Sequence, residues 1–189
     1  MTTALYGGAF DPPHLGHVEV VRVAKLTLDV DALVVLVSEA PGHKEVHASA
    51  DDRLALARAA FPGEDVRPDP YPRTVDLLRA ESFDDPLVVI GADQFQDFLA
   101  WKEPEQVLAL ARLAVATRPG FPRTQLDEVL ARLERPERVA FFEIAPIPAA
   151  STEIRALVAA GEPLDGLVPP AVAELILARG LYSRRARLH

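Results

Sequence analysis

The sequence contains no cysteine, one methionine and one tryptophan. Without cysteine, the chain has no disulfide framework, no thiol nucleophile and no thiolate metal site. It also has no apolar run near the ~20 residues that a membrane-spanning helix needs. Its start, Met1-Thr2-Thr3, has neither the basic residues nor the apolar stretch of a signal peptide. These absences predict a cytoplasmic protein that has no membrane partner.

Positive charge is also scarce, because 20 Lys and Arg against 28 Asp and Glu leave a net charge of −8. A general nucleic-acid binder usually carries a basic surface, so no nucleic-acid partner is expected. The one basic run begins at Arg184, and residues 183–189 are predicted to form a flexible tail. The chain has 189 residues, 49% of them apolar, and no linker or repeat, which predicts a single domain over residues 1–189.

Short apolar runs alternate with helical patterns along the chain. Strands are predicted over residues 4–6, 32–37, 87–90, 113–117 and 139–144, with a weak one at 65–67. Helices are predicted over residues 15–28, 51–61, 73–79, 103–112, 124–133, 151–159 and 170–179, the second capped by Ser49. This alternation predicts a Rossmann-like α/β fold, a parallel sheet with helices on both faces and closing C-terminal helices. Ligands of such sheets bind beyond the carboxyl ends of the strands.

The most informative stretch runs from Tyr6 to His17 and reads YGGAFDPPHLGH. Two glycines at a strand end let the backbone turn sharply and approach a ligand. The helix start that follows offers free N–H groups and a positive dipole end to an anion. His14 and His17, three apart, are expected on one face of that helix. The stretch predicts a phosphate-handling site; half of a zinc site is the alternative, although no cysteine or E-x-x-H partner supports it.

A second stretch, from Pro148 to Arg155, reads PAASTEIR. Ser151 or Thr152 is predicted to cap the helix that follows, where free N–H groups again suit phosphate. Arg155, one turn into the helix, can offer a planar fork of donors to phosphate oxygens. An ordinary capped helix with a surface arginine is the alternative.

Both stretches resemble the signatures of the nucleotidylyltransferases that share an H-x-G-H motif. The first is similar to G-G-[ST]-F-D-P-x-H-x-G-H and departs from it at Ala9. The second is similar to I-S-S-T-x-I-R and departs from it at Ala149 and Ala150, where the family has Ile and the first Ser. The chain therefore lacks one hydroxyl that could contact phosphate in those enzymes.

Other segments resemble the bacterial nicotinate-nucleotide adenylyltransferases within that superfamily, and the likeness covers most of the chain. Residues 40–44 are similar to the P-P-H-K loop of those enzymes, and residues 73–76 to their T-x-D-T-L region. Residues 91–93 with Trp101 are similar to their G-A-D and W positions, and residues 118–120 to their R-P-G.

The resemblance implies an enzyme of NAD biosynthesis that joins nicotinate mononucleotide to ATP, giving nicotinate adenine dinucleotide and pyrophosphate by direct in-line attack on the α-phosphate. Mg²⁺ is expected to arrive with ATP, and no metal is expected to be held by the protein itself. By the same resemblance, the catalytic residues are His14, His17, Lys44 and Arg155. The ATP-binding residues are Gly7, Gly8, Ala9, Phe10, Asp11, Gly16, Gly91, Asp93, Ser151 and Thr152. The nicotinate mononucleotide-binding residues are Lys44, Thr74, Trp101 and Arg118.

Several alternatives stay open at this stage. The acceptor could be the amidated mononucleotide or phosphopantetheine, although enzymes for the latter have Thr at the position of His14. The chain could also be an inactive nucleotide-binding module, for which Ala9 and the two later alanines are the only support. Trp101 could fill a core, Asp93 could be a helix N-cap, and Lys44 could be a solvated loop residue. The oligomeric state is left open, a homo-oligomer included.

Overall fold

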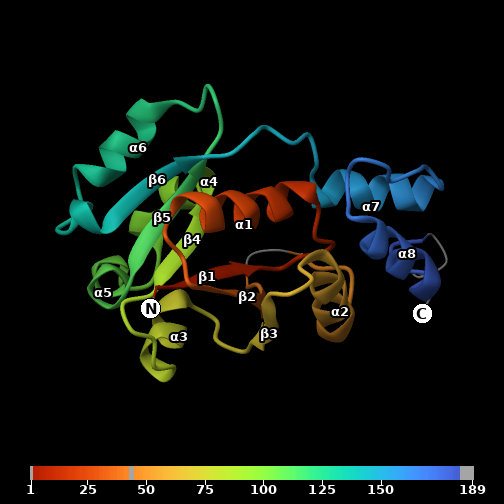
Figure 1. The fold of residues 1–189 in the computed structure, drawn as a ribbon, viewed down its shortest axis with the longest axis horizontal. Coiled ribbons are helices and arrows are strands. Elements are labelled where there is room, and N and C mark those ends of the chain that lie inside the picture. Colours follow the sequence, from red (N-terminus) through yellow and green to blue (C-terminus); the bar gives the residue numbers. More distant parts are fainter. Residues whose placement is uncertain (1, 43–44, 184–189) are drawn as a thin grey trace. The chain divides into compact units, whose positions relative to one another are not determined.

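A computed structural model describes residues 2–42 and 45–183 of the chain (Figure 1). Lys44, one of the predicted catalytic residues, and residues 184–189 of the predicted basic tail lie outside the described residues. In the part that is described, no helix is long and apolar enough to cross a membrane.

Six strands form one sheet in the order β3-β2-β1-β4-β5-β6. The strands are β1 (Thr3–Gly8), β2 (Ala32–Ser38), β3 (Asp65–Asp69), β4 (Leu87–Gly91), β5 (Arg112–Thr117) and β6 (Val139–Glu143). β1 pairs with β4 in parallel, with Ala4 opposite Leu87, and β4 with β5 and β5 with β6 are parallel too. The predicted parallel α/β fold is confirmed. Its strand order reverses at β1, the kind of switch point where such sheets bind ligands.

Helices alternate with these strands and close the chain. They are α1 (Leu15–Thr27), α2 (Ala50–Ala60), α3 (Thr74–Ala80), α4 (Ala92–Gln96), α5 (Pro104–Leu110), α6 (Arg123–Leu130), α7 (Ser151–Ala160) and α8 (Pro170–Arg179), with 3-10 turns η1 (Phe98–Ala100) and η2 (Pro136–Arg138). The prediction of helix as far as Arg112 was wrong, because Arg112 begins β5 and pairs there with Leu87. A helix start near Asp93 was indicated by the sequence, but the bounds of α4 and both 3-10 turns were not predicted, because these elements are too short to show a helical period.

The chain divides into two compact units, each made of separate chain segments. The first unit comprises Met1–Gly7, Val20–Val34 and Tyr71–Pro146, and the second comprises Gly8–Glu19, Val35–Pro70 and Ile147–His189. The single domain expected from the sequence stays a prediction.

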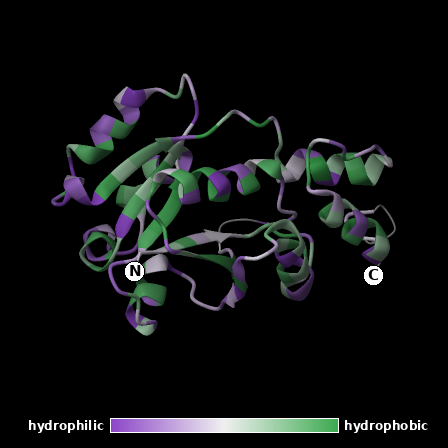
Figure 2. Cartoon of the chain, viewed as in Figure 1, coloured by the Kyte–Doolittle hydropathy of each residue, from purple (hydrophilic) through white to green (hydrophobic). Residues whose placement is uncertain are grey.

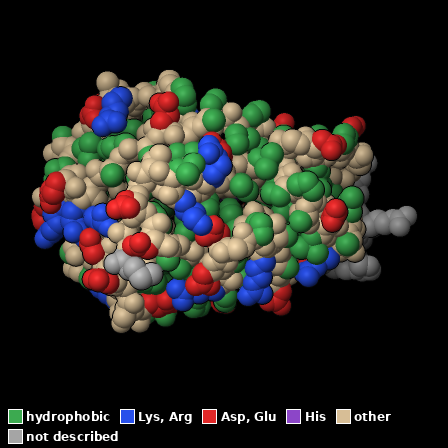
Figure 3. All heavy atoms as spheres, in the orientation of Figure 1, with side chains coloured by type: hydrophobic (Ala, Val, Ile, Leu, Met, Phe, Trp, Pro, Cys, Tyr) green, Lys and Arg blue, Asp and Glu red, His purple; other side chains and the backbone are tan. Residues whose placement is uncertain are grey.

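The core of the first unit is built on β4 and β5, whose apolar residues are almost completely buried. Figure 2 shows these two strands mostly in green, the hydrophobic end of the colour scale. Phe95 of α4 packs its ring edge-on against Phe141 of β6 and near Phe98 of η1. On the face drawn in Figure 3, Lys and Arg side chains lie among Asp and Glu side chains, as the mixed composition leads one to expect.

In the second unit, α2 packs against α8 and β3. The predicted cap of α2 is confirmed, since the Ser49 hydroxyl oxygen accepts a hydrogen bond from the Asp52 N–H. The Asp52 carboxylate in turn accepts from the Ser49 hydroxyl at 2.7 Å and pairs with Arg179 of α8 at 2.7 Å. The hydrogen bond from Ser49, then that from Arg179, lower the pKa of Asp52 below its ordinary 3.8.

We expect Asp52→Asn to lower the midpoint of thermal unfolding at pH 7 by roughly 1–3 °C, because the ion pair to α8 is partly exposed and therefore weak. A carboxylate whose pKa is depressed by folding stabilises the protein above its unfolded pKa, and loses that contribution as the pH falls through the folded value. The difference between wild type and variant should therefore shrink below pH 4. Asp51→Asn, in the same helical turn, is the matched control. An equal drop in the unfolding midpoint of that variant would show that the effect comes only from removing a negative charge near the start of α2, and not from the ion pair with Arg179.

Candidate active site

The two predicted histidines lie against each other in the second unit. His14 precedes α1 and His17 belongs to its first turn, and their ring centroids are 3.7 Å apart with an angle of 34° between the planes. The expectation that both imidazoles share one face is confirmed. The Phe10 ring packs edge-on against His17, with 5.2 Å between the ring centroids, and so helps to hold the His17 ring in place.

Backbone N–H groups fix the tautomer of both rings. Nδ1 of His14 accepts from the Gly16 N–H at 3.1 Å, and Nδ1 of His17 accepts from the His14 N–H at 3.2 Å. A nitrogen that accepts a hydrogen bond carries no proton, so in each neutral ring the proton sits on Nε2. Each imidazole is thus an Nε2–H donor, which is the form that can bind a phosphate oxygen.

The expectation of free N–H groups at the start of α1 was wrong. The N–H groups of His14 and Gly16 donate to the two rings, and that of Leu15 donates to the Leu167 carbonyl at 2.9 Å. The N–H groups of His17 and Val18 both donate to the His14 carbonyl. The backbone of this turn orients the imidazoles, and the donors it presents to an anion are the side chains.

Asp11 lies at the centre of the same turn and is almost completely buried, with 4% of its surface exposed. Its Oδ2 accepts from the His47 N–H at 2.6 Å, and its Oδ1 accepts from the Ala48 N–H at 3.1 Å and from the Tyr182 hydroxyl at 2.8 Å. Burial, then the Asp11 charge and the hydrogen bond to it, raise the pKa of Tyr182, so its hydroxyl stays a donor. Both carboxylate oxygens are thus used within the protein.

The start of α7 is bonded to the same turn. The Ser151 hydroxyl donates to the Pro12 carbonyl at 2.9 Å, and Nη1 of Arg155 donates to the Asp11 carbonyl at 2.7 Å. Nη2 of Arg155 donates to the Thr152 hydroxyl at 3.4 Å. The structure thus brings Arg155, Ser151 and Thr152 to the turn that carries the histidines.

The predicted cap of α7 was wrong. The N-cap residue is Ala150, which makes no side-chain cap, and the Ser151 hydroxyl is occupied by Pro12. The helix begins one residue earlier than a serine cap requires, so Ser151 is its first residue and bonds outward.

Glycines shape this turn differently from what we expected. The left-handed residue is Phe10, with φ of 50°, rather than either of the preceding glycines. A Cβ on Gly8 would lie 2.9 Å from the Phe10 ring, and one on Gly16 would lie 2.9 Å from the His14 ring. These two glycines are therefore needed because aromatic rings lie directly over them.

Arg53 of α2 is a supporting residue that the sequence analysis missed. Its side chain is 1% exposed and donates four hydrogen bonds, all to backbone carbonyls, those of Ala9, Ser38, Glu39 and Ala48. The sequence does contain a pattern that could have identified it. Residues 53, 56, 57 and 60 follow the helical period, which places Arg53 on the buried face of α2. A charged residue on an apolar face usually has a specific set of partners.

The remaining predicted residues lie in the first unit. Gly91 is the N-cap of α4, and its N–H donates to the Gln94 side chain at 3.1 Å. Asp93 is exposed in the first turn of α4, so the alternative of an Asp93 cap was wrong. Arg118 is exposed just after β5, the neighbour of β4 in the sheet.

Trp101 is half-buried and contacts Phe98 with a ring edge, 5.3 Å between centroids. The next residue, Lys102, pairs with Asp76 of α3 at 2.7 Å, which joins the Trp101 segment to the helix that Thr74 begins. The first unit therefore holds Thr74 and Trp101 on connected segments, with the tryptophan ring partly open to solvent.

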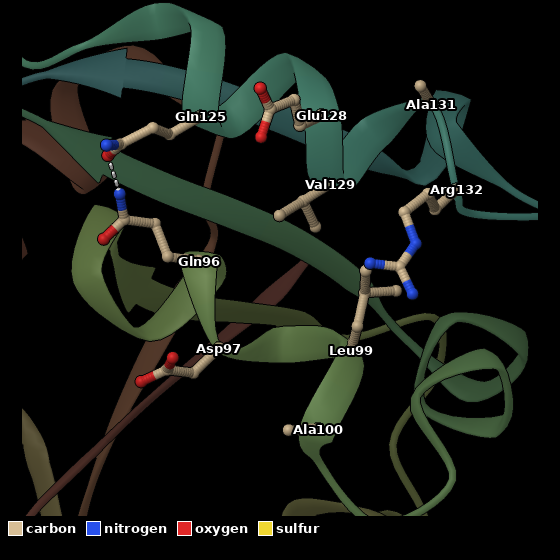
Figure 4. Close-up of a pocket in the computed structure, with 9 residues that line it drawn as sticks. All are labelled: Gln96, Asp97, Leu99, Ala100, Gln125, Glu128, Val129, Ala131 and Arg132. Carbon is tan, nitrogen blue, oxygen red and sulfur yellow. Dashed lines mark hydrogen bonds between the residues drawn. The ribbon is translucent and has the colours of Figure 1, made fainter.

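A pocket of about 660 Å³ in the first unit lies between the α4–η1 segment and α6 (Figure 4). Its residues are Gln96, Asp97, Leu99, Ala100, Gln125, Glu128, Val129, Ala131 and Arg132, and the side chains of Gln96 and Gln125 are bonded across it. It includes none of the predicted site residues.

Comparison with known proteins agrees with the motifs. Residues 5–157 match the model of the Cytidylyltransferase-like family. A protein of Chlorobaculum parvum named "Probable nicotinate-nucleotide adenylyltransferase" is 35% identical, and the match covers 96% of this chain and 99% of that protein. The chain belongs to the nicotinate-nucleotide adenylyltransferase family. A protein of the same name from Rubrobacter xylanophilus is 33% identical, over 99% of this chain and 94% of that one.

The fold is also similar to that of solved members of the family. Plasmodium falciparum nicotinic acid mononucleotide adenylyltransferase, solved in complex with NaAD, superposes with a TM-score of 0.73. The match covers 96% of this chain and 97% of that one at 17% identity, so the likeness shows the shared fold alone.

Proposed function

We propose that this protein transfers the adenylyl group of ATP to nicotinate mononucleotide, forming nicotinate adenine dinucleotide and pyrophosphate. The observation that carries the proposal is the pair of adjacent imidazoles whose Nδ1 atoms accept from backbone N–H groups, together with Arg155 of α7, which donates to the Asp11 carbonyl of the same turn. This arrangement presents side-chain donors to phosphate within a chain whose relatives bear that enzyme name over nearly their whole length.

In the proposed reaction, a phosphate oxygen of the mononucleotide attacks the α-phosphorus of ATP. The new P–O bond forms as the bond between the α-phosphorus and the bridging oxygen breaks, and that oxygen leaves with pyrophosphate. No side chain needs to act as nucleophile, so the protein contributes alignment and stabilisation of the charge on phosphate oxygens. His14 and His17 donate through Nε2 to the α-phosphate and the leaving phosphates, and Arg155 and Lys44 neutralise the remaining charge.

Mg²⁺ enters as part of the ATP substrate in this proposal. Within the described residues, no group of three or more His, Asp or Glu side chains is arranged to hold a metal ion. Mg²⁺ on nucleotide phosphates keeps several waters and needs few protein ligands, so the ion can be carried by ATP.

Other residues predicted from the sequence are proposed to recognise the organic parts of the substrates. Trp101, with its ring partly exposed, is proposed to stack on the pyridine ring, and Thr74 and Arg118 to contact the mononucleotide. Gly91 and Asp93 are proposed to contact the adenosine of ATP. Asp11 is buried against protein donors, so we propose that it supports the turn in place of touching ATP.

The experiment that tests the function is pyrophosphate release with ATP and Mg²⁺, with three acceptors offered separately. We expect turnover with nicotinate mononucleotide to exceed that with its amide by at least ~10-fold, because a site built for a carboxylate leaves polar groups unpaired against an amide. Equal turnover with both mononucleotides would support the proposed adenylyl transfer but refute nicotinate mononucleotide as the preferred acceptor. Turnover with phosphopantetheine alone, or no turnover with any acceptor, would overturn the proposed function.

A further inference from the structure

Tyr182 joins the end of the described chain to the turn that carries the histidines. Its hydroxyl donates to Oδ1 of Asp11 at 2.8 Å, across 171 residues of sequence. Both side chains are buried, with 8% of Tyr182 and 4% of Asp11 exposed. A hydrogen bond to a buried carboxylate is one of the stronger kinds in a protein, so this contact fixes the position of the acceptor.

The carboxylate that Tyr182 holds is shared by two segments of the site. Asp11 accepts the N–H groups of His47 and Ala48, which follow the loop of the predicted phosphate-binding lysine along the chain. Nη1 of Arg155 lies 4.0 Å from Oδ2 of Asp11 and donates to the Asp11 carbonyl. Rotation of the carboxylate would therefore disturb its hydrogen bonds to the 47–48 segment and its ion pair with Arg155.

Backbone conformation points to the same pair of positions. Tyr182 has a φ of 60°, and Phe10, directly before Asp11, has a φ of 50°. Bulky residues rarely adopt this left-handed region, and they keep it only where the surroundings hold them there. One of these residues makes the contact with Asp11, and the other is the chain neighbour of Asp11.

We propose that Tyr182 is a positioning residue for adenylyl transfer, which acts through the buried Asp11 carboxylate on Arg155 and on the turn of His14 and His17. The proposal rests on the proposed function of that turn. Loss of the hydroxyl should leave substrate binding largely intact and disturb the alignment needed in the transition state, so the effect should appear in kcat rather than in KM.

The test is Tyr182→Phe in the full chain, which keeps the aromatic ring and removes only the hydroxyl. We expect kcat to fall roughly ten-fold at 25 °C, with KM for ATP within a factor of about two, since small misplacements at a distance from the reacting atoms cost rate. Ser183→Ala is the matched control, because its hydroxyl donates to the Gly180 carbonyl in the same turn. It should keep the wild-type kcat.

A double-mutant cycle with Asp11→Ala, which removes the acceptor of the Tyr182 hydroxyl, separates positioning from general loss of structure. If Tyr182 acts through Asp11, then Tyr182→Phe should change kcat little in the Asp11→Ala background. Additive losses, or an unchanged kcat in the single variant Tyr182→Phe, would overturn the proposal. His17→Ala, measured in parallel, tells the two proposals apart: if it lowers kcat strongly while Tyr182→Phe keeps the wild-type kcat, only the inference about Tyr182 fails.

Discussion

His17→Ala is expected to lower kcat by about 10²–10³-fold, the usual cost of losing one preorganised donor to developing charge. The His17 Nε2–H is defined by the bond that Nδ1 accepts from the His14 backbone, so its direction is set before substrate binds. Alanine removes the donor and leaves the N–H of His14 without this acceptor. The measurement is steady-state pyrophosphate release with ATP and nicotinate mononucleotide, beside circular dichroism to confirm the fold.

His17→Gln is the informative companion to that variant. Its amide can donate a hydrogen bond but lacks the ring that Phe10 packs against, so partial activity is expected. KM for ATP should change less than kcat in both variants, because the donor acts mainly on charge that develops in the transition state. Turnover of His17→Ala close to that of the wild type would refute the assignment of the site.

Arg53→Leu is expected to lower the free energy of unfolding by about 3–5 kcal/mol, because one buried and three partly buried carbonyl oxygens lose the guanidinium that donates to them. The guanidinium binds the carbonyl of Ala9 at 2.9 Å and those of Ser38 and Glu39 at 2.6 and 3.1 Å. These carbonyls belong to the glycine turn and to the end of β2. Chemical denaturation of wild type and variant measures the loss, and activity at low temperature should fall with it.

Arg58→Leu is the matched control for that variant. Arg58 lies on the same helix, is exposed, and donates to a single carbonyl, that of Val66, at 3.4 Å. Its loss should cost less than ~1 kcal/mol, the range of a surface substitution. Arg53→Lys should fall between the two, since an ammonium has three donors but lacks the planar fork. Equal stability of Arg53→Leu and Arg58→Leu would show that the buried guanidinium has no special role.

The sequence predicted those parts of the fold and site that depend on local pattern. Continuous Val- and Leu-rich runs identified the buried strands, and the spacing of His14 and His17 predicted their adjacent rings. Ser49 was recognisable as a cap because its partner, Asp52, is only three residues away. In each case the interacting residues are close in the chain, so the contact can be predicted from the local sequence pattern.

What the sequence did not predict depends on contacts between distant segments. The N–H of Leu15 donates to Leu167, and the Ser151 hydroxyl donates to Pro12. The start of α1 therefore lacks the free N–H groups, and Ser151 the capping role, that the local sequence predicts. Tyr182 reaches Asp11 across nearly the whole chain, and no local pattern signals that contact. Arg53 is the intermediate case, because its place on the apolar face of α2 was visible in the sequence while its four acceptors were not.

The bond between Asp11 and Tyr182 also has a consequence for the order in which the protein is made. The ribosome synthesises the turn of His14 and His17 early and Tyr182, which bonds to that turn, near the end. Domains begin to fold while synthesis continues. Until residue 182 emerges, the Asp11 carboxylate has its partners at His47 and Ala48 but not its hydroxyl donor. Nascent chains should therefore hold an incomplete site, and a premature stop just before residue 182 should lower turnover at least as much as Tyr182→Phe does.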